Sequence, residues 1–171
     1  MADPVLTTRR LRWRRSRPAD LDAFHALVSD REVVKNTATW PWPPEPAFTA
    51  ARVAPFPLEN GLVGLVFCGA ELVGAMGVSA GGAGGDMGYM FARAHWGRGY
   101  ATEIGQALLA EAFARYDWPV IEACAFEGNP ASSRVLEKLG FTETGRSVGP
   151  CAARGCALPM RCFRLVRPPG G

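Results

Sequence analysis

The chain is poor in lysine, histidine and paired cysteines. Its 171 residues include two histidines and only two lysines, Lys35 and Lys138. The five cysteines contain no Cys-x-x-Cys pair, whereas a zinc site normally needs four closely spaced cysteine or histidine ligands. We therefore expect no bound metal.

Long hydrophobic runs are missing as well. No segment approaches the ~20 consecutive apolar residues that a membrane-spanning helix requires. Residues 7–17 hold six arginines in place of the apolar core of a secretory signal. We expect a cytoplasmic protein with no membrane partner.

The cysteines should be reduced in that compartment. Cys151 and Cys156 share a loop in which a disulfide is possible, but a reduced pair is the expectation. Cys68 and Cys124 lie in strand-like runs, where a thiol is expected to be buried as a small apolar group.

Two common nucleotide-binding signatures are absent. The chain has neither Gly-Lys-Ser/Thr nor Gly-x-Gly-x-x-Gly, and its net charge of +3 is small for a polyanion-binding protein. Arginines between positions 10 and 17 alternate with Leu11 and Trp13, which is typical of a strand with one buried and one solvated face. We expect no nucleic-acid partner.

The composition that remains is that of a globular protein, with 48% hydrophobic and 20% charged residues. We expect one domain over residues 1–171, as a monomer or homodimer. The patterns predict a strand at 10–15, helices from 18, 30 and 46, strands at 62–68, 72–79 and 87–92, a helix to 115, a strand at 120–126, a helix at 130–139 and two final strands. Residues 81–85, with four glycines, are expected to form a loop. This order predicts an α/β fold with a single mixed sheet and helices on both faces.

The most informative segment is His95–Glu103, which lies between a strand-like run and a helical one. Gly97 and Gly99 allow a tight turn directly before the helix. The first turn of a helix has unpaired N–H groups and a partial positive charge, and glycines let the backbone approach a phosphate. The segment is therefore a candidate anion site.

A second segment, Asn129–Phe141, reads Asn-Pro-Ala-Ser-Ser-Arg-Val-Leu-Glu-Lys-Leu-Gly-Phe. Together with Trp96–Glu103 it resembles the GNAT superfamily of acetyl-CoA-dependent N-acetyltransferases, within it the RimJ/RimL-like branch that acetylates ribosomal-protein N-termini. The resemblance covers nearly the whole chain, from Leu6–Leu11 onwards. It implies a mostly antiparallel sheet of about six to seven strands whose central strands splay apart.

The resemblance also implies where acetyl-CoA binds. Gly99 and Ala101 match the last two constrained positions of the pyrophosphate loop, while Trp96 stands where the wider family has arginine or glutamine. It further implies a β-bulge near Met90 and Phe91 that separates their strand from the one at 120–126. The cofactor-binding residues expected on this basis are Met90, Phe91, Trp96, Gly97, Arg98, Gly99, Tyr100, Ala101, Thr102, Asn129 and Ser132.

Acetyl transfer needs a neutral amine, a polarised thioester carbonyl and a proton for the leaving thiolate. Many family members use a tyrosine as proton donor where this chain has Leu136, so Ser132 is the substitute candidate. A purely structural role at the helix start is equally open for Ser132. The candidate bases are Asp86, His95, Glu45 and Glu59, and for each of them a structural or solvated role is the alternative.

Two tryptophans, Trp40 and Trp42, lie on a proline-rich segment and are candidates for acceptor binding; packing of this segment on the core is the alternative. No strong base is evident, and this favours a peptide α-amine over a lysine side chain as acceptor. The alternatives are a small-molecule amine, such as an antibiotic or amino-acid analogue, and a non-catalytic acyl-CoA-binding module.

Overall fold

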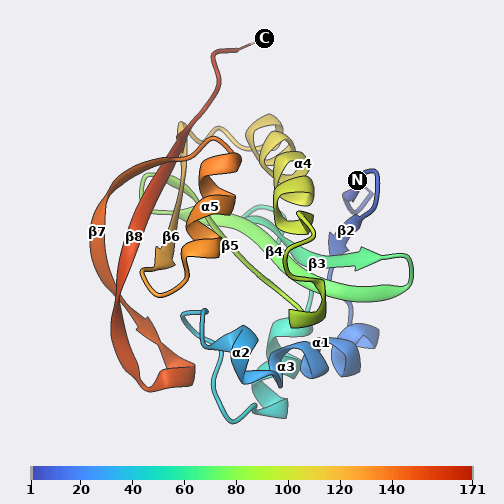
Figure 1. Cartoon of the computed structure of the whole chain (residues 1–171). Helices are drawn as coiled ribbons and strands as arrows, with labels where there is room; N and C mark the ends of the chain where they lie inside the picture. The colour runs from blue at the N-terminus through green and yellow to red at the C-terminus, as the bar shows by residue number, and fades with distance from the viewer. Residues whose placement is uncertain (1, 171) are drawn as a thin grey trace.

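Eight strands form one sheet in the order β1-β2-β3-β4-β5-β6-β8-β7 in the computed structural model, which describes residues 2–170 (Figure 1). Neighbouring strands are antiparallel except β5 and β6, which are parallel. Met1 and Gly171, the two ends of the expected domain, lie outside the described residues. The strands are β1 (Val5–Thr7), β2 (Arg12–Arg15), β3 (Gly61–Cys68), β4 (Glu71–Gly81), β5 (Gly84–Phe91), β6 (Val120–Phe126), β7 (Thr142–Cys151) and β8 (Cys156–Val166).

The predicted mixed, mostly antiparallel sheet is confirmed, but its strand count was low by one. The strand that sequence reasoning missed is β1, which has only three residues and pairs on one side with β2. The flexible or tight loop expected at 81–85 is a tight turn of only two residues, Gly82 and Ala83. Strand β4 ends at Gly81 and strand β5 begins at Gly84. Position 84 requires glycine, because a Cβ atom there would lie 2.2 Å from the backbone oxygen of Val120.

Over residues 2–170 the chain also forms five α-helices and three short 3-10 turns. Helices α4 and α5 share one hydrophobic cluster with one face, while α1, α2 and α3 share a second cluster with the other, so helices on both faces are confirmed. The elements are α1 (Leu21–Val28), α2 (Arg31–Val34), α3 (Pro46–Val53), α4 (Tyr100–Arg115), α5 (Pro130–Lys138), η1 (Pro18–Asp20), η2 (Arg93–His95) and η3 (Ala152–Arg154).

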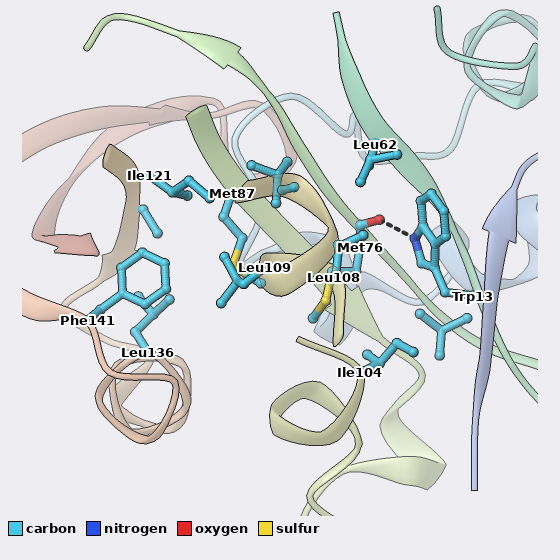
Figure 2. Packing of buried hydrophobic residues seen from close by; sticks show 14 of the residues in the cluster. Trp13, Leu62, Met76, Met87, Ile104, Leu108, Leu109, Ile121, Leu136 and Phe141 are labelled. Atoms are coloured by element: carbon cyan, nitrogen blue, oxygen red, sulfur yellow. Dashed lines mark hydrogen bonds between the residues drawn. The ribbon is translucent and has the colours of Figure 1, made fainter. Parts of the chain in front are cut away.

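Strand β2 shows how the arginine-rich N-terminal segment folds. Trp13 is fully buried in the cluster beneath α4, and its indole N–H donates to the Met76 carbonyl at 2.9 Å (Figure 2). Arg14, on the opposite face of the strand, makes two 2.8 Å bonds to the Asp20 carboxylate. The alternation predicted from sequence is therefore confirmed.

The long hairpin of β7 and β8 reaches the end of α2 (Figure 1). At its tip the Ala152 N–H donates to the Ala38 carbonyl at 3.0 Å, and the Arg154 guanidinium donates to the Lys35 carbonyl at 3.0 Å. These bonds join the C-terminal hairpin to the N-terminal helical region. Within residues 2–170, no helix is both long and apolar enough to cross a membrane.

Candidate active site

The glycine turn leads directly into α4. Gly97 and Gly99 adopt φ of 75° and 76°, in the left-handed region that favours glycine. Gly99 is the N-cap of α4, and no side chain of residues 2–170 caps this helix. Its first-turn N–H groups are therefore available to an anion.

Glu103 attaches this turn to the N-terminal segment. One carboxylate oxygen accepts from the Thr8 hydroxyl at 2.7 Å and from the Arg10 backbone N–H at 2.8 Å, and the other accepts from Arg10 Nε at 2.6 Å. The Arg10 guanidinium also lies 4.8 Å from the centre of the Tyr100 ring. Burial opposes the charged carboxylate, but these hydrogen bonds outweigh it and lower the pKa of Glu103. The first turn of α4 is thus fixed by residues almost a hundred positions away.

Strands β5 and β6 diverge soon after they begin. They pair at only two positions, where Gly85 faces Ile121 and Asp86 faces Glu122. Both strands continue past this point, and the splayed central strands implied by the resemblance are therefore present. The bulge implied at Met90 and Phe91 is not, because the register of β4 with β5 is continuous along the whole of β5.

The peptide groups of β5 at this divergence can be assigned a direction. The Ala92 N–H donates to the Val73 carbonyl of β4 at 2.8 Å. Because peptide groups alternate in direction along a strand, those of Tyr89 and Phe91 face away from β4, toward the diverging β6. The Trp96 indole N–H donates to the Phe91 carbonyl at 2.8 Å, so this side chain ties the glycine turn to the end of β5. Tyr89 is left with unused backbone groups on the open side.

A pair of hydroxyl groups lies on the α5 side of the divergence. The Tyr89 hydroxyl lies 2.7 Å from the Ser132 hydroxyl and 3.2 Å from the Ser132 carbonyl oxygen. Burial raises the pKa of Tyr89 to about 12, and the hydrogen bond with Ser132 offsets only part of this effect. Tyr89 is therefore a neutral hydrogen-bond donor at physiological pH. Sequence reasoning did not single out Tyr89, although its alternation along β5 with Met87 and Phe91 places it on the helix-covered face.

Asn129 begins α5 beside this pair. Its backbone N–H donates to the Phe126 carbonyl at 2.9 Å, and its own carbonyl accepts from the Ser132 N–H at 3.2 Å. These bonds fix the turn between β6 and α5 and bring Asn129 and Ser132 to the end of β6. Met90 and Phe91 are both buried on the opposite side of the divergence.

Asp86 lies on the other face of β5, because successive side chains in a strand point to opposite faces and Asp86 directly precedes Met87. Its side chain is at the surface, yet partial burial raises the pKa of the carboxyl, and the negative charge of Glu122 raises it further. Glu122 itself is paired with Arg164 at 2.8 Å. Asp86 is thus a carboxylate with raised proton affinity, on the face opposite the hydroxyl pair.

His95 is held away from Asp86 and Ser132. Its ring is buried, stacks on Tyr100 with 5.8 Å between centroids, and places Nε2 3.1 Å from a Glu71 oxygen. An arginine nitrogen of Arg98 lies 3.5 Å from Nδ1 on the other side of the ring. These contacts give His95 a structural place behind the glycine turn.

The two candidate acceptor tryptophans lie in different surroundings. Trp40 is buried and packs edge-on against Phe24 and Phe48, at centroid distances of 5.1 and 5.3 Å. Trp42 is exposed. Of the two, Trp42 is the one that an acceptor can reach.

Comparison with known proteins agrees with this geometry. A family model described as an acetyltransferase (GNAT) domain matches residues 10–142. The chain is 47% identical over 56 residues to an uncharacterised protein, YkkB, of Bacillus subtilis (strain 168), over 33% of each chain. It is 32% identical over 83 residues to an uncharacterised N-acetyltransferase, YoaA, of the same organism, over 48% of this chain and 47% of that protein. The matches thus span less than half the length of these relatives.

Several solved structures share the fold. RimL, a ribosomal-protein α-N-acetyltransferase in complex with coenzyme A, superposes with a TM-score of 0.83 at 20% identity, over 95% of this chain and 98% of that one. RimJ of Mycobacterium smegmatis gives a TM-score of 0.79 at 19% identity, over 95% and 86%. A microcin self-immunity acetyltransferase in complex with acetyl-CoA and AMP gives 0.78 at 14% identity, over 92% and 93%.

Proposed function

Because the chain belongs to the GNAT acetyltransferase family, we propose that it transfers the acetyl group of acetyl-CoA to a primary amine, within one domain and through a ternary complex. The observation that carries the proposal is the divergence of β5 and β6 next to the uncapped start of α4. The helix start offers N–H groups to a diphosphate, and the unpaired peptide groups of β5 match the amides of a pantetheine arm.

The contacts to acetyl-CoA follow from this placement. Residues 96–102 surround the diphosphate, with Gly97 and Gly99 leaving the backbone open. Met90 and Phe91 line the arm on one side, and Asn129 and Ser132 lie at its other side. The thioester then lies close to the Tyr89–Ser132 hydroxyl pair.

The hydroxyl pair stabilises the leaving sulfur through hydrogen bonds. Full transfer of the Tyr89 proton to a thiolate is unfavourable, because a phenol of pKa about 12 opposite a thiol of pKa ~8.5 costs about 5 kcal/mol. The attacking amine instead supplies the proton, since the tetrahedral intermediate carries an ammonium group. Ser132 and Tyr89 thus act as donors to developing charge.

Asp86 is the residue we assign to proton acceptance from the incoming amine. Its raised pKa makes it a better base than an ordinary surface carboxylate. An α-amine with pKa ~7.7–8.0 is already about one-tenth neutral at pH 7, whereas a lysine with pKa ~10.4 costs about 4–5 kcal/mol to deprotonate. A single carboxylate therefore favours a peptide N-terminal α-amine as acceptor.

The proposal is tested by following thiol release from acetyl-CoA with matched acceptors. One set consists of short peptides with free α-amines and no lysine, and the other of the same peptides with blocked α-amines and one lysine. A third set contains small amines, because the microcin self-immunity acetyltransferase has the same fold. Turnover with the first set supports the proposal. Turnover only with small amines shows that the acceptor is a small-molecule amine and not a peptide. Binding of acetyl-CoA without turnover in any set identifies a non-catalytic module.

A further inference from the structure

Two of the five cysteines lie side by side on the face of the sheet that carries Asp86. Cys124 of β6 and Cys162 of β8 are directly opposite in the antiparallel register, and their Sγ atoms are in contact at 2.7 Å. Both thiols are free, and Cys124 is exposed while Cys162 is partly exposed. The expectation that Cys124 is buried is therefore wrong, because its side chain points away from the cluster formed by Ala123 and Ala125.

The strand geometry favours a covalent link between these thiols. Residues directly opposite in an antiparallel pair have Cβ atoms ~4.5–5.5 Å apart, and a disulfide needs about 3.5–4.5 Å. A bridge therefore requires only a small adjustment of β6 and β8. Neither cysteine belongs to the residues that hold the donor substrate.

Cys151 and Cys156 are also directly opposite each other, but their thiols have different surroundings. Cys151 is buried and its thiol donates to the Lys35 carbonyl at 3.2 Å, while Cys156, its partner in the β7–β8 register, is exposed. Cys68 accepts a hydrogen bond from the Tyr100 hydroxyl at 3.7 Å. In the pair considered from the sequence, the Cys151 thiol is thus buried and hydrogen-bonded, whereas Cys156 faces solvent.

The surroundings of Cys124 disfavour its thiolate form. Partial burial of the sulfur, the hydrogen bond and charge of the neighbouring Cys162, and the charges of Asp86 and Glu122 together raise the pKa of Cys124 to about 12. The thiol form predominates at neutral pH, and only thiolates attack disulfides efficiently. Oxidation is therefore slow and requires an oxidant in excess.

We propose that Cys124 and Cys162 form a redox-modifiable site, in which a low-molecular-weight disulfide converts the two thiols to a cross-strand disulfide. This disulfide lies on the face of the sheet that carries Asp86, which we call the acceptor face. One cysteine thiolate attacks a sulfur of the small disulfide and expels one thiol. The second cysteine loses its proton and attacks the protein sulfur of the mixed disulfide, which expels the second thiol. The protein loses two electrons and two protons, and the small disulfide gains them.

The functional consequence rests on the proposed function. Strand β6 borders the divergence that takes the pantetheine arm, and Asp86 and Glu122 lie beside Cys124 on the acceptor face. A disulfide between β6 and β8 restricts the movement of β6 at the border of the divergence and removes two thiol groups from the acceptor face. We expect oxidation to lower kcat/KM for the acceptor several-fold and reduction to restore it.

The test uses the full chain incubated with oxidised glutathione and then analysed by intact mass and peptide mapping. The expected product is lighter by two hydrogen atoms, contains a Cys124–Cys162 cross-link and reverts with dithiothreitol. Cys162→Ser should abolish the cross-link, and the matched control Cys156→Ser should retain it. A product carrying glutathione at Cys124 or Cys162, a different cross-link or an unchanged mass overturns the proposal.

Activity is measured on the same samples. Oxidised wild-type protein should lose acceptor turnover, while oxidised Cys162→Ser protein should match its reduced form. Equal activity of oxidised and reduced wild-type protein overturns the link to function. If reduced protein acetylates no amine, the proposed function fails, but the mass measurement still decides whether the disulfide forms.

Discussion

The Tyr89 hydroxyl lies 2.7 Å from the Ser132 hydroxyl and thereby joins strand β5 to the first turn of α5. This bond connects the two elements between which we place the thioester. Neither group is a strong acid, so their contribution to catalysis is the orientation of donors toward the leaving sulfur.

Replacing Tyr89 with phenylalanine removes this donor and keeps the ring. We expect Tyr89→Phe to lower kcat about tenfold, equivalent to ~1.4 kcal/mol, because a hydrogen bond to developing charge is lost. KM for acetyl-CoA should stay nearly constant. Steady-state kinetics of Tyr89→Phe, Ser132→Ala and the double variant test this, and the double variant should resemble the worse single one because the hydroxyls act as a unit. Additive losses contradict a shared role.

The glycine turn makes a prediction about donor binding. In Gly99→Val a β-branched residue must adopt φ near 76°, which costs roughly 1–2 kcal/mol, and its side chain stands beside the α4 N–H groups. We expect the thermal stabilisation by coenzyme A to be lost. Gly82→Val, in the open β4–β5 turn with no atom near its Cβ position, is the control and should keep the stabilisation. An intact shift in Gly99→Val argues against the diphosphate site.

Asp86→Asn tests the proposed base. We expect kcat/KM for a peptide acceptor to fall about tenfold or more at pH 7, within the range for positioned bases. The deficit should shrink as the pH rises through ~8, because the α-amine then loses its proton without assistance. The pH–rate profiles of wild type and variant provide the measurement. Glu122→Gln, which removes the carboxylate paired with Arg164, should have a smaller effect, and a deficit independent of pH contradicts the assignment.

The Arg14–Asp20 pair predicts acid sensitivity of the fold. The hydrogen bonds from Arg14 hold the pKa of Asp20 below its usual value. A lowered carboxyl pKa stabilises the folded state above the ordinary value of ~3.9, and this contribution is lost as the pH falls through the lowered pKa. We expect Asp20→Asn to reduce the free energy of unfolding by roughly 2–3 kcal/mol at pH 7, with a smaller difference near pH 3.

Urea denaturation at both pH values checks this expectation. The matched control is Glu32→Gln, which breaks the surface pair of Glu32 with Lys35. Exposed pairs contribute little, so this variant should stay close to wild type at pH 7. Equal destabilisation by both substitutions contradicts the special place of the Arg14–Asp20 pair.

Much of the fold was readable from sequence because local patterns and tertiary packing agree. The helix that begins at 46 and the strand at 120–126 lie where they were predicted, since prolines and apolar residues mark them. Strand β1 escaped detection because three residues are too few to show a period. The loop predicted at 81–85 was too long, because glycine indicates a turn locally while Gly84 and Gly85 are needed for close packing of β5.

Only part of the candidate site could be predicted from the sequence. Backbone features such as the glycine turn follow from local sequence, so the left-handed turn at Gly97 and Gly99 before α4 was anticipated. Contacts between distant segments, such as Thr8 and Arg10 with Glu103, or Tyr89 with Ser132, leave no local pattern. The position of His95 against Glu71 and Tyr100 is of the same kind, as is the contact of Cys124 with Cys162.

The two-position pairing of β5 with β6 has a mechanical consequence. Strands β1 to β5 and strands β6, β8 and β7 form two hydrogen-bonded blocks with almost no ladder between them. The two blocks are therefore joined chiefly by side-chain packing in the cluster that they share beneath α4 and α5. A pantetheine arm bound along β5 would fill the gap between β5 and β6 and hydrogen-bond to strand backbone. The donor substrate would then hold together the two parts of the sheet between which it reacts.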